Sequence, residues 1–88
     1  MATFFVYVLR SLKDLKLCIG ITSNLAARAR KHEQGGVPST RHRRPLELVY
    51  WEKVGSRVEA RRREKYLKSG PGHAFLNQVV GRAAARLK

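Results

Sequence analysis

Acidic residues are scarce in this sequence. Six Asp and Glu residues stand against nineteen Lys and Arg residues, which gives a formal net charge of +13. Paired carboxylates for sugar chemistry are absent, as are a glycine-rich phosphate loop and the ligand spacing of a zinc site. The excess of positive charge indicates a polyanionic partner, because each basic group near a phosphate releases condensed counterions. An RNA-binding protein and a DNA-processing enzyme fit this charge equally well.

Cysteine and long apolar runs are also missing. The sequence has one cysteine, Cys18, which excludes an intramolecular disulfide and a zinc site built from several cysteines. We therefore expect a reducing, intracellular setting and a cytoplasmic location. No run approaches the roughly 18 apolar residues that a membrane span needs, and the apolar run 4–9 is too short for a signal peptide. A membrane partner is accordingly not expected.

Hydrophobic residues make up 43% of the 88 residues, which is enough for one domain with one core. Strands are predicted at 4–9, 17–21 and 46–51, and helices at 24–34, at 56–68 and after the 70–72 turn. The order strand, strand, helix, strand, helix, helix predicts an α+β fold in which helices flank a three-stranded antiparallel sheet. We expect residues 1–80 to form this single domain and the basic tail 81–88 to fray.

The first predicted helix carries two polar residues on its apolar side. At about 100° per residue, Arg28 and His32 share an arc with Leu25 and Ala29. An arginine and a histidine one turn apart beside apolar anchors are a candidate functional pair. The alternative is that Arg28 lies along the helix edge and His32 is a boundary histidine with its hydrogen bonds satisfied. The pattern alone leaves both interpretations open.

Two acids lie in the second predicted helix. Glu59 is explained by a capping box with Ser56, in which each side chain accepts a hydrogen bond from the other residue's backbone. Glu64 lies on the flank of the apolar stripe, where a carboxylate is able to bind a hard divalent cation. The alternative for Glu64 is a surface ion pair with Arg63 or Lys65, which contributes little to stability.

The basic loop 39–44 is the main candidate for contacts with nucleic acid, since a loop can wrap a phosphate backbone. The predicted nucleic-acid-binding residues are Lys31, Ser39, Thr40, Arg41, Arg43 and Arg44. The basic residues of the second helix surround it rather than mark one face, so we expect most of them to be solvated. Tyr50 and Trp51 alternate on the third strand and are expected in the core. Base stacking by Trp51 is the minor alternative.

Several motifs, taken in order, resemble those of the GIY-YIG endonucleases. In chain order they are Phe5-Val6-Tyr7, Cys18-Ile19-Gly20, Asn24-Leu25 with Arg28 and His32, and the segments 39–45, 48–50 and 63–70. The last segments resemble the small stand-alone bacterial members of that family in particular. The resemblance covers about residues 4 to 78. It implies a GIY-YIG-like fold and hydrolysis of phosphodiester bonds.

The resemblance also implies a role for each matching residue. Glu64 would ligate a divalent metal, usually Mg²⁺ (or Mn²⁺), and Arg28 would stabilise the charge that develops on the phosphate. Tyr7 would position or deprotonate the attacking water, and His32 would support it by hydrogen bonding. Gly20 would let the backbone approach the substrate.

One position departs from the family pattern, because Cys18 replaces the tyrosine that opens the second motif. Three outcomes stay open: slow catalysis that uses Tyr7, catalysis helped by another group, or loss of cleavage. We expect a weak endonuclease that acts on DNA rather than RNA. The alternatives are a nucleic-acid-binding domain with impaired catalysis and, more distantly, a subunit that docks on a larger protein partner.

Overall fold

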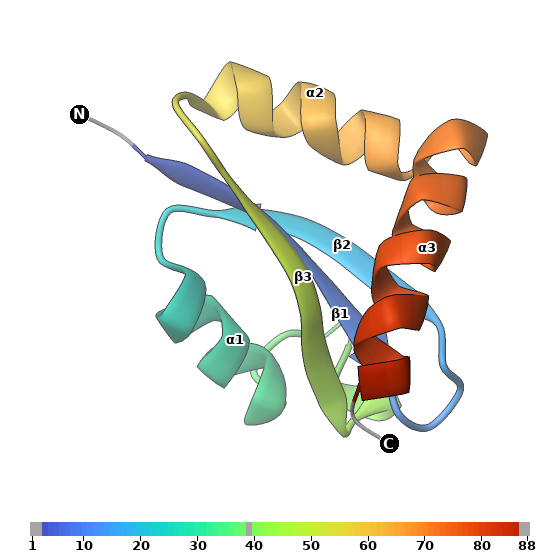
Figure 1. Ribbon diagram of the computed structural model, residues 1–88. Coiled ribbons are helices and arrows are strands. Elements are labelled where there is room, and N and C mark those ends of the chain that lie inside the picture. Colours follow the sequence, from blue (N-terminus) through green and yellow to red (C-terminus); the bar gives the residue numbers. More distant parts are fainter. Residues whose placement is uncertain (1–2, 39, 87–88) are drawn as a thin grey trace.

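A three-stranded antiparallel sheet forms the centre of the protein, and helices cover both of its faces (Figure 1). The computed structural model describes residues 3–38 and 40–86, and it describes the side chains as far as residue 80. The strands are β1 (Phe4–Ser11), β2 (Leu17–Thr22) and β3 (Leu46–Val54), and β1 lies between the other two. The helices are α1 (Leu25–Glu33), α2 (Arg57–Leu67) and α3 (Gly70–Arg86), with a short 3-10 turn η1 (Arg41–Arg43) before β3. The predicted α+β fold and its element order are confirmed.

The core lies between the sheet and the pair α2 and α3. Val6 and Val8 of the central strand are fully buried there, against Ala60 and Leu67 of α2 and Leu76 of α3. Tyr7 points to the opposite face, where α1 covers it, and it is only 3% exposed. The central strand is therefore buried on both faces, as its run of β-branched and aromatic residues predicts.

The helices begin at the residues that local capping rules select. The side chain of Asn24 accepts a hydrogen bond from the N–H of Ala27 (3.1 Å), and that of Ser56 accepts one from Glu59 (3.2 Å). The capping box of α2 is not reciprocal, however. The Glu59 carboxylate accepts the N–H of Gly55 (3.3 Å), one residue before the expected partner.

The corner between α2 and α3 requires a glycine. A Cβ atom on Gly72 would overlap the carbonyl oxygen of Tyr66 and the Cα of Leu67. The two helices therefore approach each other closely at the 70–72 turn, and α3 starts at Gly70 itself. The backbone of residues 81–86, within the predicted basic tail, continues α3. None of the helices in the described part of the chain is long and apolar enough to cross a membrane.

The prediction that Trp51 lies in the core was wrong, because this side chain is 51% exposed. The strand register places Trp51 opposite Tyr7, on the face covered by α1, and this nine-residue helix leaves the indole open to solvent. Trp51 packs edge-on against Phe5. Tyr50 points to the other face and packs edge-on against Phe75 of α3, so its predicted place beside the core is confirmed.

Candidate active site

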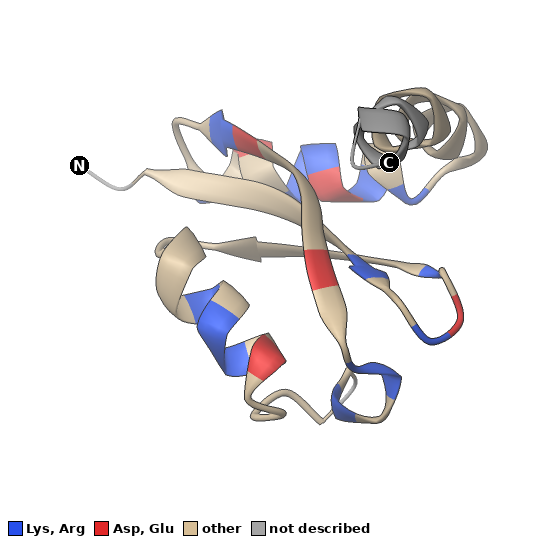
Figure 2. Ribbon diagram, turned by 60° about the horizontal axis from the view of Figure 1, so that its bottom comes forward, with Lys and Arg blue, Asp and Glu red and all other residues tan. Residues whose placement is uncertain are grey.

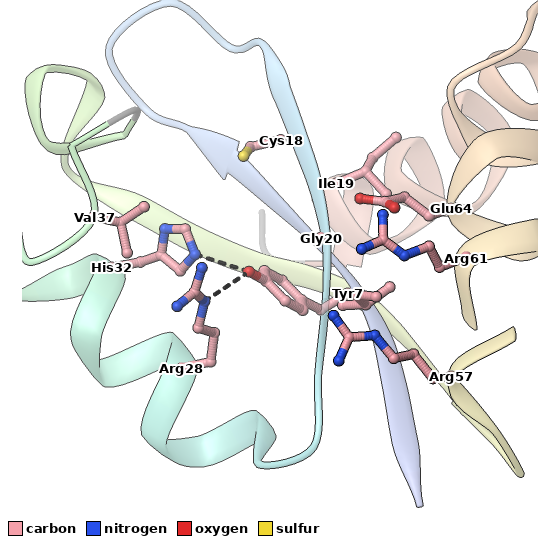
Figure 3. Close-up of a pocket in the computed structure, with 11 residues that line it drawn as sticks. Tyr7, Cys18, Ile19, Gly20, Arg28, His32, Val37, Arg57, Arg61 and Glu64 are labelled. Atoms are coloured by element: carbon pink, nitrogen blue, oxygen red, sulfur yellow. Dashed lines mark hydrogen bonds between the residues drawn. The ribbon is translucent and has the colours of Figure 1, made fainter.

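One open cavity of about 310 Å³ brings together the four residues predicted to be catalytic. It is lined by Tyr7 from β1, Arg28 and His32 from α1, and Glu64 from α2, together with Cys18 and Gly20 from β2. Figure 3 shows Arg28 and His32 on one side of β2 and Glu64 on the other, with the phenol of Tyr7 between them. Residues from four elements thus converge at the free edge of the sheet.

The hydroxyl of Tyr7 is held by two side chains of α1. It lies 2.9 Å from Nε2 of His32, and it accepts a hydrogen bond from Nε of Arg28 at 3.3 Å (dashed in Figure 3). Gly20 lies opposite Tyr7 in the register of β1 with β2. A Cβ atom at Gly20 would come within 2.5 Å of the Tyr7 hydroxyl oxygen and 2.7 Å of Cζ. The space that this glycine leaves is therefore filled by the phenol of Tyr7.

His32 is a buried, neutral hydrogen-bonding residue. It is 2% exposed, and its second ring nitrogen, Nδ1, lies 2.7 Å from the hydroxyl of Thr40. Burial lowers the pKa of the imidazole, and the positive charges of Arg28 and Lys31 lower it further. His32 is consequently uncharged at neutral pH, which leaves one ring nitrogen free to accept a hydrogen bond.

Two arginines of α2 face the same cavity and were missed at the level of sequence. Arg57 and Arg61 line it beside Glu64, and neither has an ion-pair partner in the part of the chain that the structure describes. With Arg28, three guanidinium groups therefore approach the cavity from both of its sides (Figure 3). Lys and Arg positions, blue in Figure 2, occur on both α1 and α2, the helices that carry these arginines. The spacing of Arg57, Arg61 and Glu64, at i, i+4 and i+7, is the signal that identifies this face of the helix.

Glu64 directs a carboxylate into the cavity. Its side chain is 20% exposed and lies 3.3 Å from Nζ of Lys68, one turn along the helix. Neither of the two bases predicted as alternative partners pairs with it, and Arg63 instead binds Glu52 at 2.8 and 2.9 Å. An exposed i,i+4 ion pair is weak. The carboxylate therefore remains available to a cation.

The donor set fits a divalent cation that keeps most of its water ligands rather than a caged metal. No group of three or more His, Cys, Asp or Glu residues that could hold a metal ion occurs within residues 3–38 and 40–86. Magnesium keeps most of its water ligands and is commonly held by one or two carboxylates together with substrate phosphates. Glu64 is the one carboxylate among the described residues that line the cavity, beside three arginines, and such a donor set fits an ion bound in that way.

Comparison with known proteins identifies the domain. The family model of the GIY-YIG catalytic domain matches residues 3–72. This chain belongs to the GIY-YIG family. Membership indicates an endonuclease, an enzyme that hydrolyses phosphodiester bonds, and so a nucleic-acid substrate.

Small proteins of bacteria and archaea are similar to this GIY-YIG chain. A UPF0213 protein of Staphylococcus haemolyticus is 43% identical over 70 residues, which cover 78% of this chain and 84% of the relative. One of Clostridium perfringens is 43% identical over 65 residues (73% and 69%), and one of Natronomonas pharaonis is 42% identical over 69 residues (77% and 80%). No solved structure matches the chain.

Cys18, the residue predicted to replace the second tyrosine of the GIY-YIG pattern, lines the cavity. Burial raises the pKa of this thiol, and the positive charges of Arg43, Lys68 and Arg28 counter that effect only in part. The thiol is therefore protonated at neutral pH. A neutral thiol is a weak hydrogen-bond donor and a poor base. The Tyr7 hydroxyl and Nε2 of His32, by contrast, lie within hydrogen-bonding distance at this GIY-YIG site.

None of residues 40–44, the described part of the basic loop before β3, lines the cavity. Arg43 pairs with Asp14 of the β1–β2 turn (3.5 Å), and its carbonyl accepts the hydroxyl of Ser11 (2.6 Å). Arg44 donates to the carbonyl of Arg41 (3.0 Å). These contacts hold the loop against the β1–β2 hairpin. Arg43 and Arg44 are therefore engaged in contacts within the protein.

The other predicted contacts with nucleic acid are divided between surface and interior. Lys31 and Arg41 are exposed and remain available to a phosphate backbone. Thr40 is 1% exposed, and its hydroxyl is engaged with His32. It therefore belongs to the buried support of the site rather than to the exposed loop surface. Ser39 lies outside the described residues.

Proposed function

We propose that this protein is a divalent-metal-dependent endonuclease that hydrolyses phosphodiester bonds in DNA. The observation that carries the proposal is the convergence of the Tyr7 hydroxyl, the Arg28 guanidinium and the Glu64 carboxylate on one cavity. These are a group that orients water, a group that stabilises anionic charge and a ligand for a hard cation. Membership of the GIY-YIG family supports the same reaction.

In this mechanism, the phosphate lies between Arg28 on one side of the cavity and Arg57 and Arg61 on the other. A water molecule bound to the Tyr7 oxygen attacks phosphorus, and the bond between phosphorus and the leaving sugar oxygen breaks. The water proton passes to the Tyr7 oxygen as the phenolic proton moves to Nε2 of His32, which lies 2.9 Å away. A solvent water protonates the leaving oxygen. Arg28 stabilises the negative charge that develops on the phosphate.

Glu64 would hold Mg²⁺ (or Mn²⁺) at the side of the cavity opposite Arg28. When bound, the ion supplies positive charge close to the phosphate and orients the substrate. Lys68 pairs with the same carboxylate at 3.3 Å, so metal binding requires only the release of one exposed lysine. Such an exchange costs little free energy, because an exposed ion pair contributes at most about 1 kcal/mol to stability.

DNA is the proposed polymer, and binding should depend steeply on salt. The formal charge of +13 and the unpaired arginines of the cavity favour a long polyanion. If about six phosphates are neutralised, log K falls against log salt with a slope of roughly −5.

A nuclease assay with matched variants tests the proposal. Nicked, branched and single-stranded DNA are incubated with the wild type, with Glu64→Gln and with Glu33→Gln, with and without Mg²⁺. Both substitutions remove one negative charge, but Glu33 is an exposed residue of α1 that does not line the cavity. Cleavage by the wild type and Glu33→Gln, and none by Glu64→Gln, is expected. Equal cleavage by all three proteins would place the activity at another site or in a contaminant.

A second candidate function is DNA binding without cleavage, and the neutral thiol of Cys18 in the cavity is the observation that favours it. This function predicts tight binding in EDTA and no cleavage with any divalent ion. The variant Cys18→Tyr separates the two functions. Cleavage that appears only in Cys18→Tyr would show that the rest of the site is sound and that the natural chain is a binding protein.

A further inference from the structure

A line of hydrogen bonds continues from the catalytic phenol into the interior of the protein. Nε2 of His32 lies 2.9 Å from the Tyr7 hydroxyl, and Nδ1 lies 2.7 Å from Oγ1 of Thr40. The Thr40 hydroxyl in turn lies 3.4 Å from the carbonyl oxygen of Val37. His32 and Thr40 are 2% and 1% exposed, so bulk water hardly reaches them, and Tyr7, which is 3% exposed, meets water only at the cavity that it lines. The hydrogens of His32 and Thr40 must therefore find partners within this line.

The position of the Thr40 hydroxyl is set by its own backbone. The N–H groups of Thr40 (3.1 Å) and Arg41 (3.0 Å) both bind the carbonyl of Val37, which closes the turn after α1. This turn places Oγ1 of Thr40 next to Nδ1 of His32. Thr40 is thus fixed by local geometry and does not depend on the substrate or on the rest of the cavity.

Counting donors and acceptors selects one form of the imidazole. Arg28 is only a donor, and it already gives its Nε–H to the Tyr7 oxygen. Within the described residues, the one acceptor available to the phenolic hydrogen is Nε2 of His32. Nε2 must then be unprotonated, so the ring hydrogen is on Nδ1 and is donated to Thr40. The Thr40 hydrogen goes to Val37, and every hydrogen in the line has a partner.

The other tautomer would disable the phenol. If Nε2 carried the hydrogen, it would donate to the Tyr7 oxygen, which would then accept from both His32 and Arg28. The phenolic hydrogen would have to point into the cavity, and the oxygen would have no lone pair left for a water molecule. A doubly protonated ring would also donate its Nε2–H to the Tyr7 oxygen and leave that oxygen no lone pair for a water molecule. It is also disfavoured by the burial of His32 and by the charges of Arg28 and Lys31.

We propose that Thr40 is a positioning residue that holds His32 in the Nδ1–H tautomer, and that this tautomer leaves the Tyr7 oxygen able to accept a hydrogen bond from the attacking water. Thr40 acts through His32 and touches neither the substrate nor the metal. The consequence for catalysis rests on the proposed nuclease function. The tautomer itself is a property of the folded protein and is testable without any substrate.

The direct test is nitrogen-15 NMR of the histidine rings at a pH at which His32 is neutral. The one-bond coupling between nitrogen and hydrogen tells which ring nitrogen is protonated. The wild type and Thr40→Ser are expected to carry the hydrogen on Nδ1. Thr40→Val keeps the shape of the side chain but removes the acceptor, so the hydrogen is expected on Nε2. A wild-type ring protonated on Nε2, or an unchanged ring in Thr40→Val, overturns the proposal.

Cleavage kinetics provide the second test. Thr40→Val is expected to lower kcat on the order of 10- to 100-fold, as is common when a partner that fixes a histidine tautomer is lost. KM should be unchanged, because Thr40 does not contact the substrate, and Thr40→Ser should restore kcat. Loss of kcat in both variants would indicate a packing role and refute the tautomer mechanism.

The pH profile of kcat adds a readout that a packing defect would not change. In Thr40→Val the acid limb of the profile should shift to lower pH, because the doubly protonated imidazole loses the acceptor for its Nδ1–H group and the charged form becomes less stable. The charged and titratable groups that line the cavity or act on His32 within the described residues are retained in this variant. They are Tyr7 from β1, Cys18 from β2, Arg28 and Lys31 from α1, and Arg57, Arg61 and Glu64 from α2, with Arg43 and Lys68 nearby. If the wild type cleaves no DNA, the nuclease proposal fails while the NMR experiment still decides the role of Thr40.

Discussion

Replacing Gly20 by alanine would disturb the active site with a single methyl group. The new Cβ would lie 2.5 Å from the Tyr7 oxygen and 2.7 Å from Cζ, whereas ordinary contacts begin at 3.4 Å. The phenol must therefore move by about 0.9 Å, because the β2 backbone that carries the methyl is paired with β1. Tyr7 is buried and bonded to His32 at 2.9 Å, so this movement breaks the alignment of the pair.

The expected loss of activity follows from that displacement. A misplacement of about 1 Å can cost on the order of 100-fold in rate, and the loss should appear in kcat because Tyr7 acts on the attacking water. Overpacking of a buried ring should also lower the free energy of unfolding by about 1 to 3 kcal/mol. Gly55→Ala is the matched control, since the nearest atom to its Cβ would be Oε2 of Glu59 at 3.8 Å.

A double-mutant cycle with Tyr7→Phe gives the decisive comparison. Single-turnover cleavage is measured for the wild type, for each single variant and for the pair. Once the hydroxyl is absent, moving the ring removes little further activity, so Gly20→Ala should cost much less in the Tyr7→Phe background. Additive losses, or wild-type kcat in Gly20→Ala, would refute the reasoning that this glycine makes room for a working phenol.

Three further predictions concern the metal, the pH dependence of stability and the core. EDTA should abolish cleavage but leave DNA binding largely intact in a gel-shift assay, because arginines rather than the metal attract the backbone. Glu52→Gln should cost about 1 to 3 kcal/mol of unfolding free energy at neutral pH. Burial raises the pKa of this carboxyl, but hydrogen bonds from Arg63 and Tyr50 outweigh it and hold the pKa below its ordinary value. The stabilisation is therefore present above the ordinary pKa and lost as pH falls through the lowered one, so urea titrations should show the two proteins converging in acid. Leu76→Ala should cost about 2 to 5 kcal/mol, because Leu76 is fully buried, whereas Leu12→Ala at a 48% exposed position should cost little.

The ion pair between Arg63 and Glu52 explains why neighbouring residues of α2 have different roles. Arg63 turns toward the core side, where it binds Glu52 at 2.8 Å and lies over the rings of Tyr66 and Phe75. Glu64, the next residue, is about 100° further round the helix and faces the cavity. One helix therefore supplies both a structural ion pair and a candidate metal ligand.

Local sequence was enough to predict the elements and their order. Side chains of Asn24 and Ser56 start two helices through bonds to residues three positions away, and such bonds need no tertiary contact. The period of the apolar residues placed His32 on the inner side of α1 in the same way. The helix pattern also selected Glu64 on the flank of the apolar stripe, and the family motifs added Tyr7, but spacing by itself does not bring these two residues together.

Which side chains meet was decided only by the tertiary structure. Pairing of β1 with both other strands places Tyr7 between Gly20 and Trp51. Gly20 leaves room for the phenol of Tyr7, whereas Trp51 remains exposed. The sequence predicted Thr40 in a surface loop, but the turn after α1 buries its hydroxyl against the ring of His32. The reason is physical: periodicity tells which side of a helix or strand faces inward, whereas strand register and helix docking determine which residues it meets there.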